Sequence, residues 1–297
     1  MPILYLAKVN LNSSIFDVYE KKLDIHTVMD LIYDKISCKY DYEKRTNEKY
    51  SDSLGNDLPY IRESKYSFKE IDKKDDKIIT GKIVRTFNRP TEKLNDETQK
   101  MQNTVVMENV SIYFYYDVYN EMISFCERQS FGYNQFIEAF TELLNQCVKK
   151  YQFKIFLQKD KDILEEKINS LKKVYKVKAV LIPPNSNEEE LDTLREHLNY
   201  MSQIQDVNAN KMLLEYSSSN MKMDSELMKE IFDASSRGYG DVTATGINQD
   251  GHMQMIKSSQ DAAFTSVIGE NIKEEDYNRE AKNLIQRFLE KRKHKAG

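Results

Sequence analysis

The sequence predicts an α+β fold: an N-terminal, mostly antiparallel sheet with hairpins, then a region of alternating strands and helices, then a C-terminal helix. Three observations support this fold class. Short segments of alternating polarity flank turns in the first half. Apolar β-branched runs alternate with amphipathic stretches in the second half. The last stretch carries an apolar stripe at helical spacing. The pattern divides the 297 residues into an antiparallel-sheet region, 1–130, and an alternating region, 131–297, and leaves open whether they form one continuous domain.

The first region is predicted to open with a strand and a helix and to continue as hairpins. Residues 40–63 are polar and charged and include a turn cluster, so we expect an irregular insertion there. Residues 88–103 form a second polar connection. The expected elements are a strand at Ile3–Asn10, a helix at Ile25–Lys39, and the hairpins Tyr66–Ile71 with Lys77–Phe87 and Val110–Asp117 with Met122–Arg128.

The second region alternates helices with apolar strands. Its clearest element is a helix over Asn134–Lys149, in which Asn134 can act as the N-cap. Gly238 is placed to end a later helix, and Gly251 supplies the turn of a closing hairpin. The remaining expected elements are strands at Phe153–Leu157, Val177–Ile182 and Met212–Tyr216, a helix capped by Asn187, and a final helix striped by Tyr277, Ala281, Leu284, Ile285, Phe288 and Leu289 that ends in the basic run 291–295.

Composition restricts the classes of partner. The net charge is −4, so the chain as a whole does not attract nucleic acid or an acidic membrane, and a polyanion site has to be a local patch. No apolar run approaches the roughly 18 residues of a membrane span. Cys38, Cys126 and Cys147 are odd in number and lie among apolar neighbours, which predicts buried thiols in a reducing, cytoplasmic compartment.

The sequence contains no clear cofactor or metal motif, and we expect neither a cofactor nor a metal. No two of the four histidines have the spacing that places both on one helix face. A nuclease with dispersed carboxylates is an alternative, because metal-bound water attacks phosphodiesters without a protein nucleophile. The candidate ligands lie at expected strand ends and turns: Asp117, Glu127, Asp241 and Asp250. With 48 acidic residues, such positions also arise by chance.

Basic residues on the expected sheet predict a nucleic-acid surface. Tyr113 and Tyr115 lie nearby and could stack on bases. A solvated sheet face with cross-strand pairs is the alternative interpretation. The candidate nucleic-acid-binding residues are Lys82, Arg85, Arg89, Arg128, Lys149 and Lys150. Around the expected turn at Gly238 and Gly240, Arg237 and Tyr239 are candidate ligand contacts.

Several short segments between 110 and 257 carry a resemblance. They are Arg128-Gln129-Ser130, Phe131-Gly132-Tyr133-Asn134, Pro184-Asn185, Gly238-Tyr239 and Asp250-Gly251. With the order of the elements, these segments resemble uncharacterised bacterial domain families whose genes occur in phage-defence and abortive-infection loci. The resemblance implies a cytoplasmic bacterial protein that acts near phage or nucleic acid, and it implies no catalytic residues.

The leading hypothesis is therefore a non-enzymatic component of bacterial antiphage defence that binds nucleic acid or a phage-derived partner. Two alternatives stay open: a metal-dependent nuclease, and a structural or homo-oligomerising module that binds protein. The sequence does not decide whether the protein is an enzyme. No membrane partner is expected.

Overall fold

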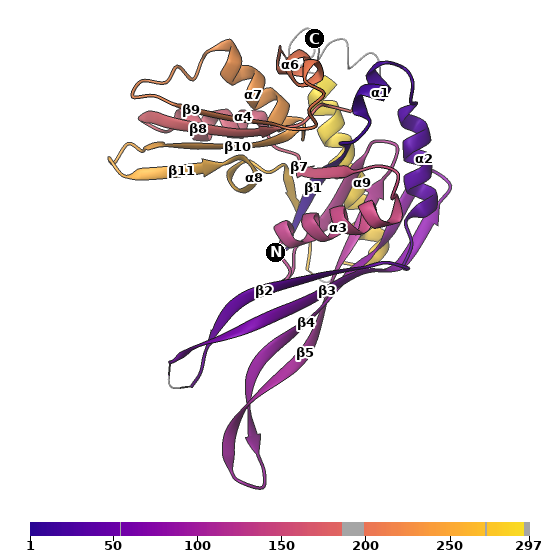
Figure 1. Cartoon of the computed structure of the whole chain (residues 1–297), viewed down its shortest axis with the longest axis vertical. Helices are drawn as coiled ribbons and strands as arrows, with labels where there is room; N and C mark the ends of the chain where they lie inside the picture. The colour runs from indigo at the N-terminus through magenta and orange to yellow at the C-terminus, as the bar shows by residue number, and fades with distance from the viewer. Residues whose placement is uncertain (54, 186–198, 271, 294–297) are drawn as a thin grey trace.

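The computed structural model describes residues 1–53, 55–185, 199–270 and 272–293 (Figure 1). It confirms the predicted α+β class: antiparallel hairpins come first, strands and helices alternate next, and a helix closes the chain. Most of the helix predicted after Asn187 lies outside the described residues. The elements are β1 (Ile3–Leu11), α1 (Ile15–Tyr19), α2 (Ile25–Lys35), β2 (Asp41–Ser51), β3 (Asp57–Lys74), β4 (Ile78–Asn95), β5 (Lys100–Asp117), β6 (Met122–Cys126), α3 (Tyr133–Cys147), β7 (Phe153–Leu157), α4 (Lys161–Asn169), β8 (Lys173–Leu181), α6 (Asn199–Asp206), β9 (Met212–Ser217), α7 (Glu226–Ser236), β10 (Gly240–Ile247), β11 (Met253–Lys257), α8 (Ser258–Asp261), β12 (Thr265–Val267) and α9 (Glu274–Lys293).

The first sheet has the strand order β12-β1-β6-β5-β4-β3-β2, and β7 also pairs with β1. Strands β7 and β12 come from the second half of the chain, yet both pair antiparallel with β1. One hydrophobic cluster runs from Ala7 to Ala262 and includes residues of both sheets. The two halves predicted from the sequence therefore share a sheet and a core.

Helices cover both faces of the first sheet (Figure 1). On one face, α3 inserts Phe136 and Phe140 among the aromatic rings of β3, β5 and β6. On the other face, α9 packs Tyr277 and Leu284 against Leu4 of β1 and its neighbours. Because successive strand side chains point to opposite faces, β1 contributes to both clusters.

Helix α3 begins one residue earlier than expected. Gly132, rather than Asn134, is the N-cap, and its backbone N–H donates to the Gln135 side chain at 3.2 Å. The prediction for the cap was wrong, whereas the apolar stripe of the helix is buried as predicted.

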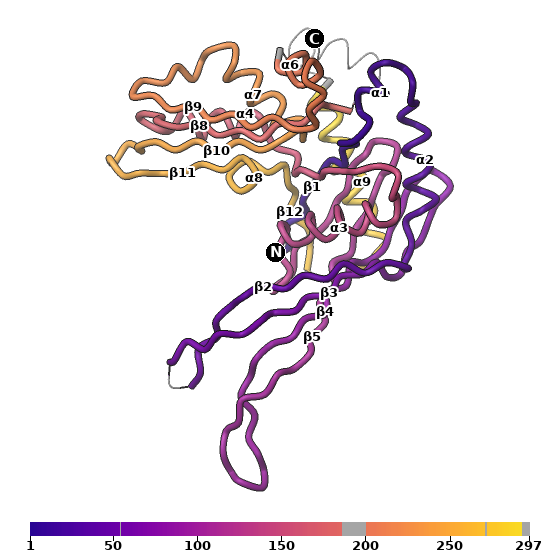
Figure 2. Tube along the Cα trace, in the orientation of Figure 1, coloured from indigo at the N-terminus to yellow at the C-terminus, as the bar shows by residue number. Residues whose placement is uncertain are grey.

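The β2–β3 and β4–β5 hairpins project from the body as two long arms (Figure 2). The prediction of an irregular insertion at 40–63 was therefore wrong, as was that of a polar connection at 88–103, because most of both segments is strand. Toward the tips these strands have exposed and half-buried residues and none that is fully buried, so no core imposes a regular apolar alternation on them.

The two arms separate beyond the pair Ser64 and Phe87, where the ladder between β3 and β4 ends. Past this point the Asn88 side chain bridges them: its Nδ2 donates to the Ile61 carbonyl at 3.0 Å, and its Oδ1 accepts from the Glu63 N–H at 2.8 Å. Nearer the tips, the Ser53 N–H also donates to Glu92 Oε1 at 3.1 Å, so side-chain hydrogen bonds take the place of the backbone ladder.

The second sheet has the order β11-β10-β8-β9, and all its neighbours pair antiparallel. The alternation of strands and helices thus does not produce parallel crossovers here. Helices α4 and α7 supply Leu164, Ile231 and Phe232 to the core shared with β8 and β10. Gly238 ends the α7 segment at φ 78° and Gly251 turns the closing hairpin at φ 85°, as predicted.

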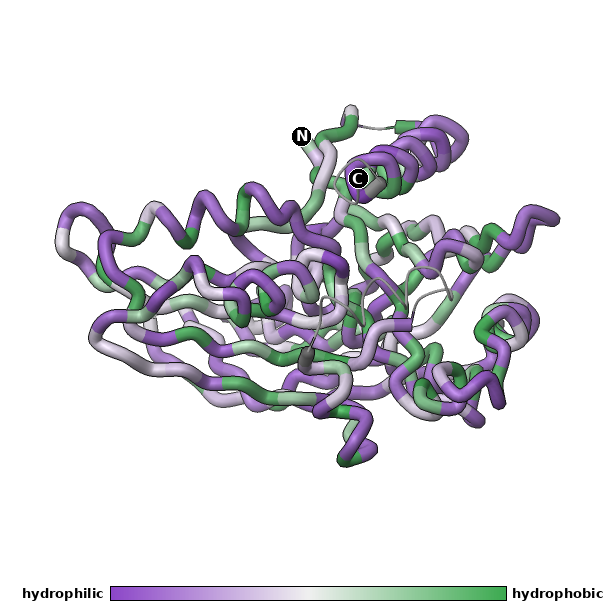
Figure 3. Tube along the Cα trace, turned by 90° about the horizontal axis from the view of Figure 1, so that it is seen from above, coloured by the Kyte–Doolittle hydropathy of each residue, from purple (hydrophilic) through white to green (hydrophobic). Residues whose placement is uncertain are grey.

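Hydrophobic and hydrophilic residues alternate over short distances along most elements (Figure 3). Within the described ranges, no helix has both the length and the apolar character needed to cross a bilayer.

Candidate functional site

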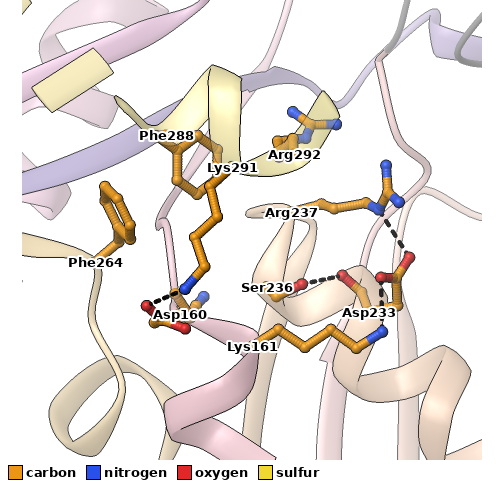
Figure 4. Close-up of a pocket in the computed structure, with 10 residues that line it drawn as sticks. Asp160, Lys161, Asp233, Ser236, Arg237, Phe264, Phe288, Lys291 and Arg292 are labelled. Carbon is orange, nitrogen blue, oxygen red and sulfur yellow. Dashed lines mark hydrogen bonds and ion pairs between the residues drawn. The ribbon is translucent and has the colours of Figure 1, made fainter. Parts of the chain in front are cut away.

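A pocket of about 100 Å³ lies where α4, α7 and α9 approach one another. Its walls come from four stretches of chain: the start of α4, the end of α7, the residue before β12 and the last turns of α9 (Figure 4). The volume is several times what one water occupies, about 10–15 Å³ on the same measure. The lining residues are Lys159, Asp160, Lys161, Asp233, Ser236, Arg237, Phe264, Phe288, Lys291 and Arg292.

Backbone hydrogen bonds hold the first wall in place. Gln158 follows β7, and its N–H donates to the Leu6 carbonyl while its own carbonyl accepts from Phe264, both at 2.8 Å. Asp160 then caps α4 by accepting from the N–H groups of Asp162 and Ile163. The chain therefore leaves the first sheet and starts a helix at the rim of the pocket.

Ion pairs join the walls. Lys291 Nζ of α9 lies 2.6 Å from Asp160 Oδ2 of the α4 cap. Asp233 of α7 accepts from two cations, Lys161 at 3.2 Å and Arg237 at 2.7 Å. These contacts connect the C-terminal helix to the helices of the second sheet, as the dashed lines in Figure 4 mark.

The lining carries an excess of positive charge. Four side chains bring a cation to it, Lys161, Arg237, Lys291 and Arg292, against the two carboxylates Asp160 and Asp233. Lys159 adds no charge inside, because its ammonium is buried against the Gly240 carbonyl and Asp241. Further anionic partners, Asp162 for Lys291 and Glu121 for Arg292, lie outside the lining. Each of the four cations thus has a carboxylate partner, while the lining alone holds four cations against two carboxylates, which favours an anionic ligand there.

A buried polar cluster lies behind Arg292. Lys8 of β1 and Glu121 of the β5–β6 turn are 2.9 Å apart, and Asn185 donates a second hydrogen bond to Glu121. Burial raises the pKa of Glu121 and lowers the pKa of Lys8 more than their attraction offsets. Burial also lowers the pKa of Arg292, to about 10, against the opposing effect of Glu121. Arg292 therefore keeps its charge at neutral pH.

The pocket has an apolar side as well. Phe264 and Phe288 meet edge to face with their centroids 5.0 Å apart. In Figure 4 these rings lie on the opposite side of the pocket from Arg237. An anionic group held by the cations would therefore have an aromatic wall beside it, which suits a ligand with a phosphate next to a sugar or base.

Arg85 does not lie where the sequence interpretation put it. Only 2% of the residue is exposed, and its guanidinium lies 4.4 Å from the Phe87 ring centroid. It donates to Ser64 Oγ at 3.0 Å and to the Ser130 carbonyl. The expected surface formed by Arg85 with Arg89 and Arg128 is thus corrected: Arg85 points into the α3 face of the sheet and fastens the loop before α3.

The other predicted basic residues are accessible to different degrees and do not converge in the pocket. Arg89 is exposed and pairs with Glu108 at 2.8 Å, while Lys82 is half-buried and pairs with Glu70. Exposed positions are also found for Arg128, Lys149 and Lys150. Ion pairs with nearby glutamates thus neutralise part of the positive charge of these candidate residues.

Of the two predicted ligand contacts, only Arg237 lines the pocket. Tyr239 is fully buried, with the Lys8 ammonium 5.6 Å from its ring centroid, so a ligand does not reach it in this conformation. The prediction for Tyr239 is corrected on that ground.

Most of the pocket was missed from the sequence. One local signal was present: the charged run Lys159-Asp160-Lys161-Asp162 directly follows the apolar strand β7. Lys291 and Arg292 belong to the basic run, but they are the last turn of a packed helix, and residues 294–295 of that run lie outside the described residues. No pattern in the neighbouring sequence indicates that this basic run contacts residue 160 in the folded protein.

The candidate carboxylates do not assemble. Asp117 binds Asn120, Glu127 binds Tyr5, and Asp241 binds Lys159, while Asp250 is exposed in the closing turn. Over the part of the chain that the structure describes, no three His, Cys, Asp or Glu residues are grouped to hold a metal. Of the cysteines, Cys147 is buried, Cys126 is half-buried and Cys38 is exposed, so the prediction of burial was wrong for Cys38.

A family model described as "Domain of unknown function (DUF4747)" matches residues 52–286, which is most of the chain. The matched range includes the β4–β5 arm, strand β3 of the other arm, the second sheet and most of α9. No curated protein matches the sequence.

Proposed function

This chain belongs to the DUF4747 family, and we propose that it binds nucleic acid without cutting it, by holding a phosphate group in the basic pocket between α4, α7 and α9. The observation that carries the proposal is a cavity of about 100 Å³ whose lining holds four cationic side chains and two carboxylates. A chain with net charge −4 has to bind a polyanion at such a local concentration of positive charge.

The chemistry of the lining supports a phosphate group in particular. Arg237 and Arg292 carry planar guanidinium groups, which bind phosphate oxygens through paired hydrogen bonds. Asp233 fixes Arg237 in position from the preceding turn of α7. The rings of Phe264 and Phe288 supply an apolar wall for the sugar or base that adjoins the phosphate.

The binding test measures fluorescence anisotropy of labelled single-stranded and duplex DNA and RNA across a salt series. We expect Lys161→Gln and Arg292→Gln to weaken binding. Each lost phosphate contact lowers the log–log salt slope by roughly 0.7–0.9. Inorganic phosphate is expected to compete with the nucleic acid, because it occupies the same cavity.

Matched controls lie on the same two helices. Lys167→Gln on α4 and Arg279→Gln on α9 remove exposed cations that do not line the pocket. These variants are expected to bind like the wild type, and the melting temperature of every variant is measured to confirm folding. Equal affinity of pocket and control variants, or no salt-sensitive binding by the wild type, would refute the proposal.

We further propose that this binding serves bacterial antiphage defence, on the strength of the resemblance carried by residues 110–257. The test expresses the wild type and Lys161→Gln in a bacterial host and compares phage plating efficiency. Protection by the wild type and by Lys167→Gln, and its loss in Lys161→Gln, is the expected result. Equal plating on all strains for a broad phage panel would contradict the defence role, while the binding measurement would stand separately.

A further inference from the structure

Strand β5 has a long edge without a neighbouring strand. It pairs with β4 from Lys100 to Asp117, whereas β6 pairs with its other edge only from Phe114 to Asp117. Among the strands that the structure describes, none pairs with that edge between 100 and 113. The hairpin projects away from the body, so the edge is open to another molecule (Figure 1).

This edge lacks the usual protection against pairing. Exposed edges normally carry charged residues or proline, which prevent another strand from adding on. The other outer edge, β2, follows that rule, with six charged residues between Asp41 and Ser51. The seven residues from Met101 to Met107 in β5 contain neither a charge nor a proline.

The same part of the arm exposes an apolar face. Leu94 of β4 lies opposite Met101 of β5 in the ladder, and alternation places Val105 and Met107 on the same face. These side chains are 52%, 56%, 60% and 63% exposed, respectively. A group of exposed apolar residues on one face of a protruding arm is typical of an interaction surface.

We propose that the occupant of this edge is a second copy of the chain, which adds its own β5 antiparallel to form a two-fold symmetric dimer. The charges of the edge are self-complementary, and Glu108 also pairs with Arg89 of its own copy. Between 100 and 108 the only charged residues are Lys100 and Glu108, of opposite sign and equally distant from Thr104. With Thr104 on the two-fold axis, Lys100 of each copy lies opposite Glu108 of the other.

The apolar residues fit the same register. Met101 of one copy lies opposite Met107 of the other, and Val105 lies opposite Asn103. In this register the apolar faces of both arms lie on the same side of the combined sheet. A shift of one residue would place them on opposite sides. One register thus pairs the free backbone groups of the edge, places opposite charges against each other and aligns the apolar residues of the two copies.

The test measures the molecular mass in solution by sedimentation over a concentration series. The wild type is expected to pass from monomer to dimer as concentration rises. Val105→Lys places a charge on the edge and is expected to leave the protein monomeric. Leu213→Lys is the control, because Leu213 is exposed to a similar extent on β9, at the edge of the other sheet. This variant is expected to dimerise like the wild type.

Charge reversal then tests the register. Lys100→Glu sets like charges opposite each other and is expected to weaken the dimer, and adding Glu108→Lys in the same chain restores opposite charges and is expected to recover it. In a Cys38→Ser background, oxidation of Thr104→Cys is expected to link two copies, whereas Thr86→Cys, on β4, is not. A wild type that stays monomeric throughout, or a dimer that survives Val105→Lys, overturns the proposal.

Discussion

The ammonium of Lys8 and the carboxylate of Glu121 lie 2.9 Å apart in the interior of the protein, between the first sheet and the end of α9. Asn185 donates to the same carboxylate, and Arg292 of the pocket interacts with it electrostatically. This pair therefore connects the fold to the proposed phosphate site. Removing one member of such a buried ion pair lowers stability strongly, because the other charge is left buried without its partner.

Removing either partner alone is therefore expected to destabilise the protein strongly. Lys8→Met or Glu121→Leu should each lower the free energy of unfolding by about 3–5 kcal/mol. The double variant buries no unpaired charge at these positions, so its loss should be smaller than the sum of the two single losses. Chemical denaturation of the wild type, the two single variants and the double variant measures the coupling energy between the two residues. Additive losses would mean that the two residues act independently.

The pH dependence of stability has a defined sign for Glu121. Burial raises its pKa in the folded protein, so the native state keeps the proton to a higher pH than the unfolded chain does. As pH rises from the unfolded value of about 4.3 through the raised folded pKa, ionisation of Glu121 subtracts from stability. Glu121→Gln cannot ionise. The free energy of unfolding of the wild type minus that of this variant should thus fall across that window in pH-resolved denaturation; a rise would show that the pKa is lowered instead.

Arg85 and Arg89 offer a matched comparison on one strand. Arg85→Met should cost about 1–3 kcal/mol, because it leaves the buried Ser64 hydroxyl and the Ser130 carbonyl without their partner. Arg89→Met removes only a partly exposed ion pair with Glu108 and should change stability by less than about 0.5 kcal/mol. Thermal melts of both variants check this. Equal melting temperatures would mean that Arg85 does not hold the loop before α3.

Phe140 should be among the most sensitive core positions. It is fully buried in α3, and its ring contacts those of Phe68, Phe114 and Tyr116 edge to face. Phe140→Ala should lower the free energy of unfolding by about 3–5 kcal/mol, since it removes apolar contact and leaves a cavity. Tyr119→Ala, at an exposed aromatic, is the control and should be nearly neutral. A Phe140→Ala protein as stable as this control would contradict the packing described.

The sequence by itself was enough to predict the helices and strands that pack one face against a core, because that packing sets the period of their apolar residues. The apolar stripes predicted α3 and α9, and the alternation over 110–117 predicted the base of β5, because a half-buried element has to repeat its apolar residues with its own period. Alternation along the segment 77–87 places Arg85 on the same face as Ile83 and Phe87, so the sequence itself indicated that Arg85 is buried.

Tertiary structure alone decided the arms and the pocket. Near the tips of β2–β5 no residue of these strands is fully buried, so no core imposes a regular apolar pattern there. Their ladders form between segments in which the sequence predicted an insertion and a polar connection. The pocket brings residues near 160, 235, 264 and 290 together. An ion pair such as that of Lys291 with Asp160 depends on distance in space, and charges so far apart along the chain leave no local signal that they will meet.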